Sequence, residues 1–572
     1  MADMQIDQKN LTKLFSDMQK RKFIIPDYQR PYNWDTEKCE ILWGDLKDNF
    51  LSAPDKDYFL GTIVTYKNGS NLEVIDGQQR LTTFSLLLRA FYTKLETMQP
   101  TADVKGLKRQ IGACLWDVDD ISEEVKDKRQ TRIDTKVATE KDKGTFNYIM
   151  ETGELTEQKN NYSNNYEFFQ EECNKFAVEN PMMWYHFCSY ILKKCVLLPI
   201  ECVDEEIALT IFSTLNNRGM PLSDADIFKS ELYKVCKTEA EKADFIAKWD
   251  ALTEVCDATK DKKGNYEFTI DDIFMYYMQV LRGRENNKDT TNIGLRTYYL
   301  KKGGTYRLMQ PGLIDEILEL AEFWRSAYGF SGKYNMSDDT MKWLHCLWAF
   351  PNTIWVYPVS AYFLTNKDML GDWESETTQE QLSKFMKKLC AFVYAKYIYK
   401  PSLSQIKGDI YTLDVEICQK APLTTMDNSF VTDQTKTELD KFIVTKKFVR
   451  GILTIDAYLN PNQKELLKNP DKLEIEHILP QKWQMANYNG WDKESAVECL
   501  EKFGNKVLFE KKLNIQAGNG YFAQKKVKYK DSKIANVKDL AELETNDWSK
   551  DELNQRDTDL KDRVIDFFKG IK

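Results

Sequence analysis

The stretch Glu476-His477-Ile478-Leu479-Pro480 decides how the C-terminal part of this 572-residue chain folds. It is followed by Gly504-Asn505-Lys506-Val507-Leu508, and Asn514 comes nine positions after Asn505. The chain has three histidines, and only His477 stands in such a frame. A lone histidine is more often a structural residue, so the ordered set is the informative signal: His-x-x-Pro, Gly-Asn with an apolar run, Asn, and then a basic helix.

These residue types suit the hydrolysis of a phosphodiester. The neutral imidazole of His477 can take a proton from water and so supply a nucleophile near neutral pH. A divalent cation such as Mg²⁺ takes oxygen ligands, which we expect from the Glu476 carboxylate and the Asn514 amide. Asn505 is expected to hold the loop that carries His477 and to orient its ring. The predicted catalytic residues are therefore His477, Asn505 and Asn514, and the predicted metal ligands are Glu476 and Asn514.

A basic helix is expected at about residues 521–529, with Lys525, Lys526, Lys528 and Lys530 facing phosphate or solvent. Lys525 and Lys526 are the predicted contacts to DNA phosphate. The whole arrangement resembles an HNH nuclease, which implies a ββα fold around a metal. One departure is that HNH nucleases more often carry Asp before the histidine, whereas Glu476 is one methylene longer. No Cys-x-x-Cys pair flanks the region, which disfavours a zinc-stapled variant.

A second set of motifs lies near the N-terminus. Residues 24–34 read Ile-Ile-Pro-Asp-Tyr-Gln-Arg-Pro-Tyr-Asn-Trp, and residues 76–80 read Asp-Gly-Gln-Gln-Arg. Val74-Ile75 is typical of a buried strand, and residues 81–92 have the apolar spacing of a helix. The Asp-Gly pair between them predicts a strand-to-helix junction, where helix N–H groups and an arginine bind phosphate. The alternative is an ordinary tight turn with a surface arginine.

With both sets of motifs, the chain resembles a GmrSD-type modification-dependent (type IV) restriction enzyme in which the two halves are fused. The resemblance implies an N-terminal ParB/sulfiredoxin-like domain whose DGQQR motif serves nucleotide binding and hydrolysis, and a C-terminal HNH nuclease. A third matching block is Phe-Ser-Thr-Leu-Asn-Asn-Arg-Gly at residues 212–219, followed by Leu222, Asp224, Asp226 and Lys229. The implied nucleotide-binding residues are Gln29, Arg30, Asp76, Gly77, Gln78, Gln79 and Arg80.

The third block also has a reading from the residues alone. Ser223 with Asp226 three positions later resembles an N-terminal capping box for a helix over residues 225–235. Asn216, Arg218 and Lys229 then either close over the nucleotide or the DNA, or belong to plain capping and turn chemistry. The two readings are equally compatible with the sequence.

Composition sets broader limits. A net charge of −9 excludes a general polyanion binder, so DNA contact needs local basic patches such as residues 506–512 and 525–530. No stretch is long and apolar enough for a bilayer, and the N-terminus lacks the pattern of a signal peptide. Twelve scattered cysteines indicate reduced thiols in the cytoplasm. Tryptophans and tyrosines at helical intervals between residues 236 and 425 are more typical of a core than of base stacking.

These observations predict an α+β, multidomain protein. A ParB-like nucleotide-binding domain is expected over residues 1–235, a helical middle over 236–425 and an HNH endonuclease domain over 426–572. The expected function is nucleotide-regulated, Mg²⁺-dependent cleavage of foreign double-stranded DNA in antiphage defence, with a nucleoside triphosphate as second ligand and a possible homodimer. By resemblance, the trigger is a DNA modification such as glucosylated hydroxymethylcytosine or a phosphorothioate. Two alternatives stay open: a nucleotide-dependent sensor or adaptor with a weak or inactive HNH site, and an abortive-infection ribonuclease.

Overall fold

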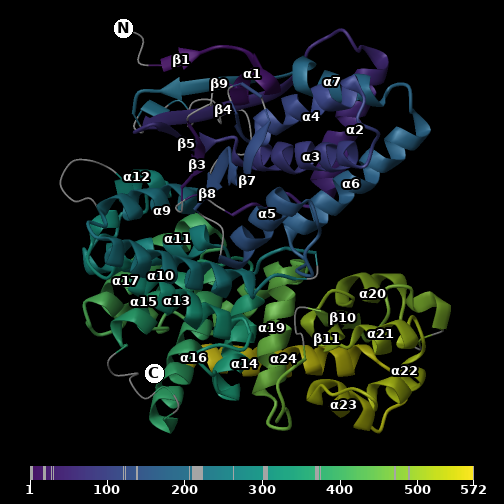
Figure 1. Ribbon diagram of the computed structural model, residues 1–572. Helices are drawn as coiled ribbons and strands as arrows, with labels where there is room; N and C mark the ends of the chain where they lie inside the picture. The colour runs from purple at the N-terminus through teal and green to yellow at the C-terminus, as the bar shows by residue number, and fades with distance from the viewer. Residues whose placement is uncertain are drawn as a thin grey trace. The chain divides into compact units, whose positions relative to one another are not determined.

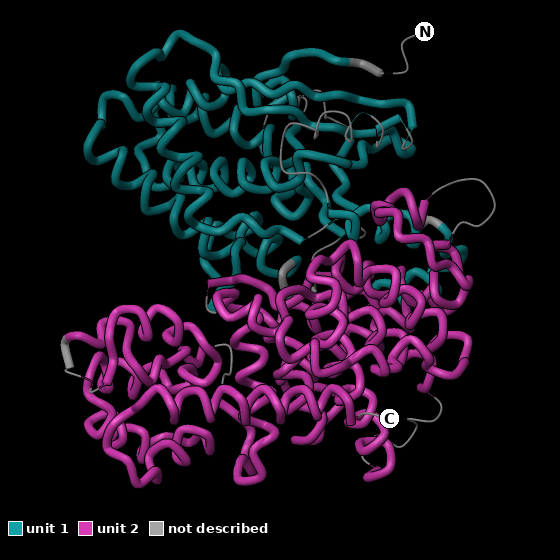
Figure 2. Tube along the Cα trace, turned by 180° about the vertical axis from the view of Figure 1, so that it is seen from behind, with its two compact units in different colours: residues 1–246 teal, residues 247–572 magenta. Residues whose placement is uncertain are grey.

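The computed structural model describes residues 4–16, 21–26, 29, 31–119, 121–122, 124–136, 140–204, 207–208, 211, 223–261, 263–300, 307–367, 373, 375–468, 472–486, 488 and 490–570. Its contacts divide the chain into two compact units, residues 1–246 and 247–572 (Figure 2). Both helices and strands are present, so the mixed α and β character expected from the sequence is confirmed. The predicted division of the second unit near residue 425 stays a prediction.

A mixed sheet organises the first unit (Figure 1). Its strand order is β1-β9-β4-β5-β3-β8, and β2 pairs with β9. β4 runs parallel to β9 and antiparallel to β5, whereas β3 runs parallel to both β5 and β8. The strands are β1 (Met4–Ile6), β2 (Lys9–Asn10), β3 (Phe23–Ile25), β4 (Tyr58–Asn68), β5 (Asn71–Asp76), β8 (Ile133–Thr135) and β9 (Cys195–Cys202).

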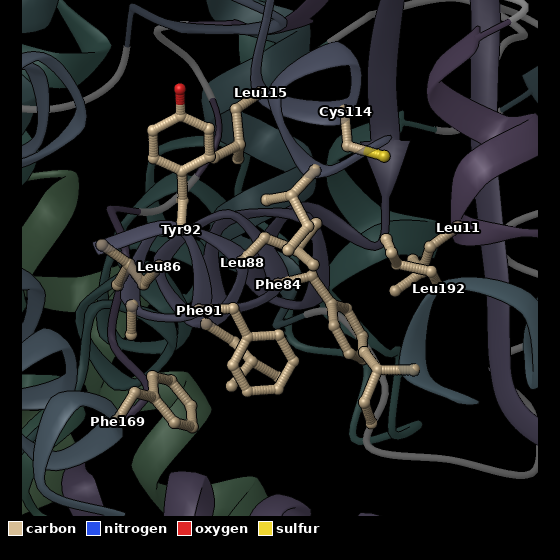
Figure 3. Packing of buried hydrophobic residues seen from close by; sticks show 14 of the residues in the cluster. Leu11, Phe84, Leu86, Leu88, Phe91, Tyr92, Cys114, Leu115, Phe169 and Leu192 are labelled. Carbon is tan, nitrogen blue, oxygen red and sulfur yellow. The ribbon is translucent and has the colours of Figure 1, made fainter. Parts of the chain in front are cut away.

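Helix α3 (Gln78–Glu96) runs through the core of this unit and is buried on nearly every side. The helix expected over residues 81–92 is confirmed, and the structure extends it at both ends. Phe91 packs edge-on against Trp184 at 5.4 Å, in a core that Figure 3 shows at close range. Polar side chains such as Thr83 and Arg89 are buried along it together with the apolar ones. The same core includes residues of α1 (Leu11–Ser16), α2 (Thr36–Ser52), α4 (Ala102–Leu115), α5 (Glu140–Thr152), α6 (Asn161–Glu179) and α7 (Trp184–Lys194).

Two smaller features complete the first unit. β6 (Trp116–Val118) and β7 (Val125–Thr131) form a separate antiparallel pair. α9 (Asp224–Val235) begins after Ser223, whose hydroxyl accepts a hydrogen bond from the Asp226 N–H at 3.1 Å. This is the N-terminal cap expected from the sequence. The 212–219 block and Leu222 lie outside the described residues.

The second unit begins with stacked helices. They are α11 (Ile270–Arg284), α12 (Leu295–Leu300), α13 (Leu313–Ala327), α14 (Asp338–Trp348), α15 (Val356–Thr365), α16 (Glu376–Tyr399), α17 (Leu403–Cys418), α18 (Asp433–Leu439) and α19 (Lys446–Leu459), preceded by α10 (Glu239–Asp257), which crosses the division between the units. Trp324 and Trp355 are fully buried, and Trp348 lies 4.6 Å from Trp355. Trp324 and Trp355 are core residues, as the sequence favoured, whereas Trp348 is half-buried.

The chain ends in a small β-hairpin surrounded by helices. β10 (Glu474–His477) pairs antiparallel with β11 (Lys506–Phe509), with α20 (Lys493–Cys499) in the connection between them. α21 (Lys511–Ala517), α22 (Phe522–Tyr529), α23 (Ala535–Glu542) and α24 (Lys550–Lys569) follow. The basic helix expected at about residues 521–529 is thus confirmed as α22.

Two expectations from the sequence concern the cysteines and membrane-spanning segments. All twelve cysteines are free thiols, and ten of them are buried. Among the described helices, none has both the length and the apolar character needed to cross a membrane.

Candidate functional site

The hairpin places His477 at the end of β10, directly opposite Lys506 at the start of β11. α21 begins two residues after β11 ends, which completes a β-β-α arrangement. Successive side chains of a strand point to opposite faces, so Glu476 and His477 face different surroundings.

On the face of His477, a carboxylate stands between two basic groups. The His477 ring is 17% exposed, and its Nε2 atom is buried 3.4 Å from Glu501 Oε1. Among the described residues, Nε2 has no hydrogen bond of good geometry. The other carboxylate oxygen of Glu501 lies 2.5 Å from Lys506 Nζ, which also donates to the Ile443 carbonyl at 2.6 Å. Lys506 thus fixes Glu501 beside the ring.

The electrostatics of this cluster favour a neutral imidazole beside an ionised carboxylate. Burial lowers the pKa of His477, and Lys506 lowers it further, against the opposing effect of Glu501. Burial would raise the pKa of Glu501, but its contacts with Lys506 and His477 together bring that pKa below the ordinary value. At neutral pH a neutral His477 can accept a proton, and the adjacent Glu501 can stabilise the cation that results.

On the opposite face, Glu476 is enclosed by α22. Glu476 Oε1 accepts hydrogen bonds from Lys525 Nζ at 2.6 Å and from the Tyr529 hydroxyl at 2.8 Å. Lys525 Nζ also donates to the backbone carbonyl of His477 at 2.7 Å. Burial raises the pKa of Glu476 and lowers that of Lys525, and the close contact between the two opposes both shifts.

This arrangement does not fit the predicted metal site. Glu476 is 5% exposed, and the oxygen described above already accepts two hydrogen bonds. Asn514 is half-buried on α21. Within the described ranges of the chain, no group of three or more His, Cys, Asp or Glu side chains is placed to hold a metal ion. A divalent cation at Glu476 would require the Lys525 contact to open.

Asn505 anchors the loop that follows His477. It is fully buried, its Oδ1 accepts from the Leu479 N–H at 2.7 Å, and its Nδ2 donates to the Leu479 and Leu500 carbonyls at 3.0 Å each. Trp548 Nε1 donates to the same Oδ1 at 3.2 Å. These contacts support the anchoring role that the sequence suggested for Asn505, although they reach the backbone near His477 and not its ring.

The lysines of α22 do not form the exposed basic face that the sequence predicts. Lys525 does not face solvent or phosphate: its side chain is fully buried, because it pairs with Glu476. Lys526 donates to the carbonyls of Leu543 and Thr545. Lys530 is exposed. This geometry favours a positioning role for Lys525. Lys526 could contact DNA phosphate only by giving up its hydrogen bonds to the two carbonyls.

The second set of motifs forms the predicted strand-to-helix junction. β5 ends at Asp76 and α3 begins at Gln78, with Gly77 between them at φ +94°. A Cβ atom at Gly77 would lie 2.9 Å from Ile63 Cγ1. Only glycine suits both the positive φ and this close approach. The N-cap position of α3 makes no side-chain cap hydrogen bond, and the N–H groups of a helix N-terminus are a common site for anions.

The side chains of the junction divide into two groups. Gln78 Nε2 donates to Gln29 Oε1 at 3.3 Å, and Gln29 Nε2 donates to the Ile75 carbonyl at 3.2 Å. Arg80 Nη1 donates to the Thr62 carbonyl at 2.5 Å. Gln79 instead turns inward and holds the 31–34 segment: its Oε1 accepts from the N–H groups of residues 33 and 34, and its Nε2 donates to the carbonyl of residue 31. Arg30 lies outside the described residues.

Three residues that contact the hairpin or its functional residues were not identified from the sequence, namely Glu501, Tyr529 and Arg556. Glu501 belongs to no recognisable motif, and nothing in its spacing points to His477. Tyr529 was detectable, because it stands four positions after Lys525 and so shares its face of the helix. Arg556 of α24 donates to the carbonyls of Phe503, Gly504 and Lys506, a contact that only the folded chain reveals.

Residues 11–233 match the family model of the GmrSD restriction endonuclease, N-terminal domain, and residues 425–563 match that of the GmrSD restriction endonucleases, C-terminal domain. No curated protein matches the chain. The two matches cover the junction around Gly77 and the hairpin that carries His477, in the order in which the chain presents them. The chain belongs to the GmrSD restriction endonuclease family.

Proposed function

We propose that this protein is an HNH-type endonuclease that cleaves foreign DNA in the cytoplasm, under the control of a bound nucleotide, as part of antiphage defence. The observation that carries the proposal is His477, placed beside Glu501 at the end of β10 and followed by the Asn505-anchored loop. Membership of a restriction endonuclease family supports DNA as substrate. The modification that marks the DNA is the part that rests on resemblance alone.

His477 is the proposed general base. Its neutral ring takes a proton from water as the water oxygen attacks phosphorus and the bond to the leaving oxygen breaks. Glu501, held ionised by Lys506, stabilises the imidazolium formed in this step. Lys525 positions the strand from behind through the His477 carbonyl. A Mg²⁺ requirement remains a prediction of the motif, and Glu476 would bind the ion only after releasing Lys525.

The junction around Gly77 is the proposed nucleotide site. N–H groups in the first turn of α3 would hold phosphate oxygens, and Arg80, which donates to the Thr62 carbonyl, would instead donate to a phosphate. Gln78 lies in the first turn of α3 and donates to Gln29, so these two side chains are the proposed source of amide groups for the nucleotide. Asp76, at the end of β5, is the proposed residue for positioning a metal or a water. The direction in which nucleotide changes cleavage is left to experiment.

The test of the cleavage site is His477→Ala, with His186→Ala as matched control. His186 is exposed on α7 and outside the hairpin. Loss of a general base typically slows a reaction about 10²–10⁴-fold. We expect that loss of DNA cleavage for His477→Ala and none for His186→Ala, with nucleotide hydrolysis unchanged in both. Cleavage by His477→Ala at the wild-type rate would show that His477 is not the general base.

One observation favours a second function. Because Lys525 and Tyr529 occupy Glu476, the site can also be that of a nucleotide-dependent sensor or adaptor whose nuclease is weak or inactive. Incubation of plasmid with and without Mg²⁺ distinguishes the two, since a sensor leaves the plasmid intact under both conditions. Parallel incubation with total RNA identifies the ribonuclease alternative, in which RNA and not plasmid is degraded.

A further inference from the structure

A cavity of about 600 Å³ lies in the second unit, away from the hairpin. We call it the α11–α17 cavity, after the helices that form two of its walls (both labelled in Figure 1). α11 contributes Gln279 and Arg282, and α17 contributes Lys407 and Tyr411. On each helix these residues are three or four positions apart, so each pair shares one helix face. The cavity is within the size range of small-molecule sites.

Arg282 is a buried cation with unused hydrogen-bonding capacity. Its side chain is 2% exposed, and its Nε has no hydrogen-bond partner. One terminal nitrogen donates to the backbone carbonyl of Asp289, and the guanidinium lies 4.8 Å from the centre of the Tyr411 ring. An unsatisfied buried charge is costly, so a group that accepts from this guanidinium would be bound favourably.

Lys407 brings a second positive charge to the same space. Its Nζ donates to the Thr290 carbonyl at 2.6 Å and to the Asn292 side chain, and it lies 5.3 Å from the Tyr411 ring. Burial and the charge of Arg282 lower the pKa of Lys407. Two cations that repel each other across one aromatic ring form a site for an anion.

The nearest carboxyl groups do not neutralise these cations at contact distance. Asp289 is exposed and accepts hydrogen bonds from the N–H and hydroxyl of Thr291, at 2.9 and 2.7 Å. Asp414 is 2% exposed, and neither of its carboxyl oxygens has a hydrogen-bond partner. Burial raises the pKa of Asp414 well above its ordinary value, and the charge of Arg282 acts in the opposite direction. Arg282 Nε and both carboxyl oxygens of Asp414 are thus without hydrogen-bond partners among the described residues, although the two residues lie close enough to interact electrostatically.

The rest of the lining suits an organic group with a ring. Met278 and Ile354 supply apolar surface, and Tyr357 adds a ring 6.4 Å from that of Tyr411. Asn352 also lines the cavity, and its Nδ2 is buried without a hydrogen-bond partner. Inorganic phosphate would fill only a small part of this volume. A ligand that uses the whole lining has an anionic end, a flat apolar body and a polar edge.

We propose that the α11–α17 cavity binds a small organic phosphate of the size and chemistry of a nucleoside monophosphate. The phosphate lies between Arg282 and Lys407, the base lies against Tyr357, and the amides of Asn352 and Gln279 contact the polar edge of the base. This site is distinct from the junction around Gly77 and does not depend on the cleavage assigned to His477.

The experiment is isothermal titration of the full chain with AMP, GMP, CMP and inorganic phosphate. The chain carries Arg80→Ala, so that binding at the Gly77 junction is weakened and the cavity is observed by itself. Lys407→Gln is then added, since Lys407 is only half-buried and its loss is compatible with folding. The matched control is Lys384→Gln on α16, an exposed lysine that pairs with Glu380 and lines none of this cavity.

We expect saturable binding of at least one nucleotide in the Arg80→Ala chain. Lys407→Gln should weaken it by about tenfold or more, because a charge-assisted hydrogen bond is lost, and Lys384→Gln should leave it unchanged. Three results would overturn the proposal: no nucleotide binding in the Arg80→Ala chain, binding that is insensitive to Lys407→Gln, or inorganic phosphate binding as tightly as the best nucleotide. None of these measurements reads DNA cleavage, so they leave the proposed nuclease function to its own test.

Discussion

Lys525 Nζ lies 2.6 Å from Glu476 Oε1, and both side chains are almost completely withdrawn from solvent. The same ammonium group holds the backbone carbonyl of His477 at 2.7 Å. One lysine thus links the helix α22 to the strand that presents the proposed general base. Because a buried pair gains little over an apolar replacement but is costly to break, its clearest effect is on the position of β10.

Lys525→Met is expected to destabilise the second unit and to slow cleavage. Removal of one partner of a buried ion pair typically costs about 3–5 kcal/mol, because the other charge is left uncompensated. Lys528→Met on the same helix is the control and should change stability by less than about 0.5 kcal/mol. Urea unfolding measures both. Adding Glu476→Gln to Lys525→Met should recover part of the loss, and a double variant no more stable than the single one would contradict the pairing.

Glu501→Gln should lower the rate of cleavage and leave DNA affinity nearly unchanged, because the carboxylate acts on His477 and not on the substrate. Glu498→Gln provides the control: Glu498 is exposed, and it pairs with Lys502 and Lys550 at 3.1 and 3.0 Å. Single-turnover cleavage and a filter-binding assay separate the two effects. If Glu498→Gln slows cleavage as much as Glu501→Gln does, the role of Glu501 is merely structural.

The rate of cleavage should depend on pH through His477. The neutral ring is the active form, so activity is present above the pKa of His477 and is lost as the pH falls through it. Burial lowers this pKa, which places the loss below the ordinary histidine value of about 6.5. Glu501 opposes that shift, so Glu501→Gln should move the loss to still lower pH. Rates measured between about pH 5 and 8 test both statements, and a wild-type midpoint at or above about 6.5 would refute them.

Gly77→Ala should impair both the first unit and its nucleotide binding. An alanine would be strained at φ +94°, and its Cβ would meet Ile63 at 2.9 Å. Gly69→Ala is a close control, since Gly69 has φ +60° but open space around it. The control should cost about 1–2 kcal/mol from backbone strain alone, and Gly77→Ala should cost clearly more. Thermal unfolding and titration with a fluorescent nucleotide would show this, and equal effects of the two substitutions would count against the junction.

The sequence predicted the elements that depend on local pattern. Val74-Ile75 and the helix after Gly77 follow from an apolar run and an apolar period, and the structure contains both as β5 and α3. α22 also lies where its pattern placed it. In each case the signal comes from residues close together in the chain.

The features that the sequence did not predict depend on contacts between segments that are far apart in the chain. Lysine is the residue type least expected in a core, so Lys525 was assigned to the surface, and only its partner 49 positions away explains its burial. Glu501 lies in the connection between β10 and β11 and contacts His477 from there. This segment has no periodic pattern of apolar residues from which its path could be predicted. The α11–α17 cavity arises from two helices more than a hundred positions apart. Such relationships are properties of the packing and not of any motif.

The contacts of Arg556 limit how the hairpin can be separated from the rest of the protein. This arginine of α24 donates to three carbonyls just before and within β11, and Lys506 reaches back to Ile443, ahead of α19. A fragment that starts at β10 would lose the Ile443 contact, and one that stops before α24 would lose three hydrogen bonds at the turn that carries Asn505. The transferable piece for a chimaeric enzyme is therefore larger than the motif: it extends from about Ile443 to the end of α24, and grafting the β-β-α element alone would yield an unsupported hairpin.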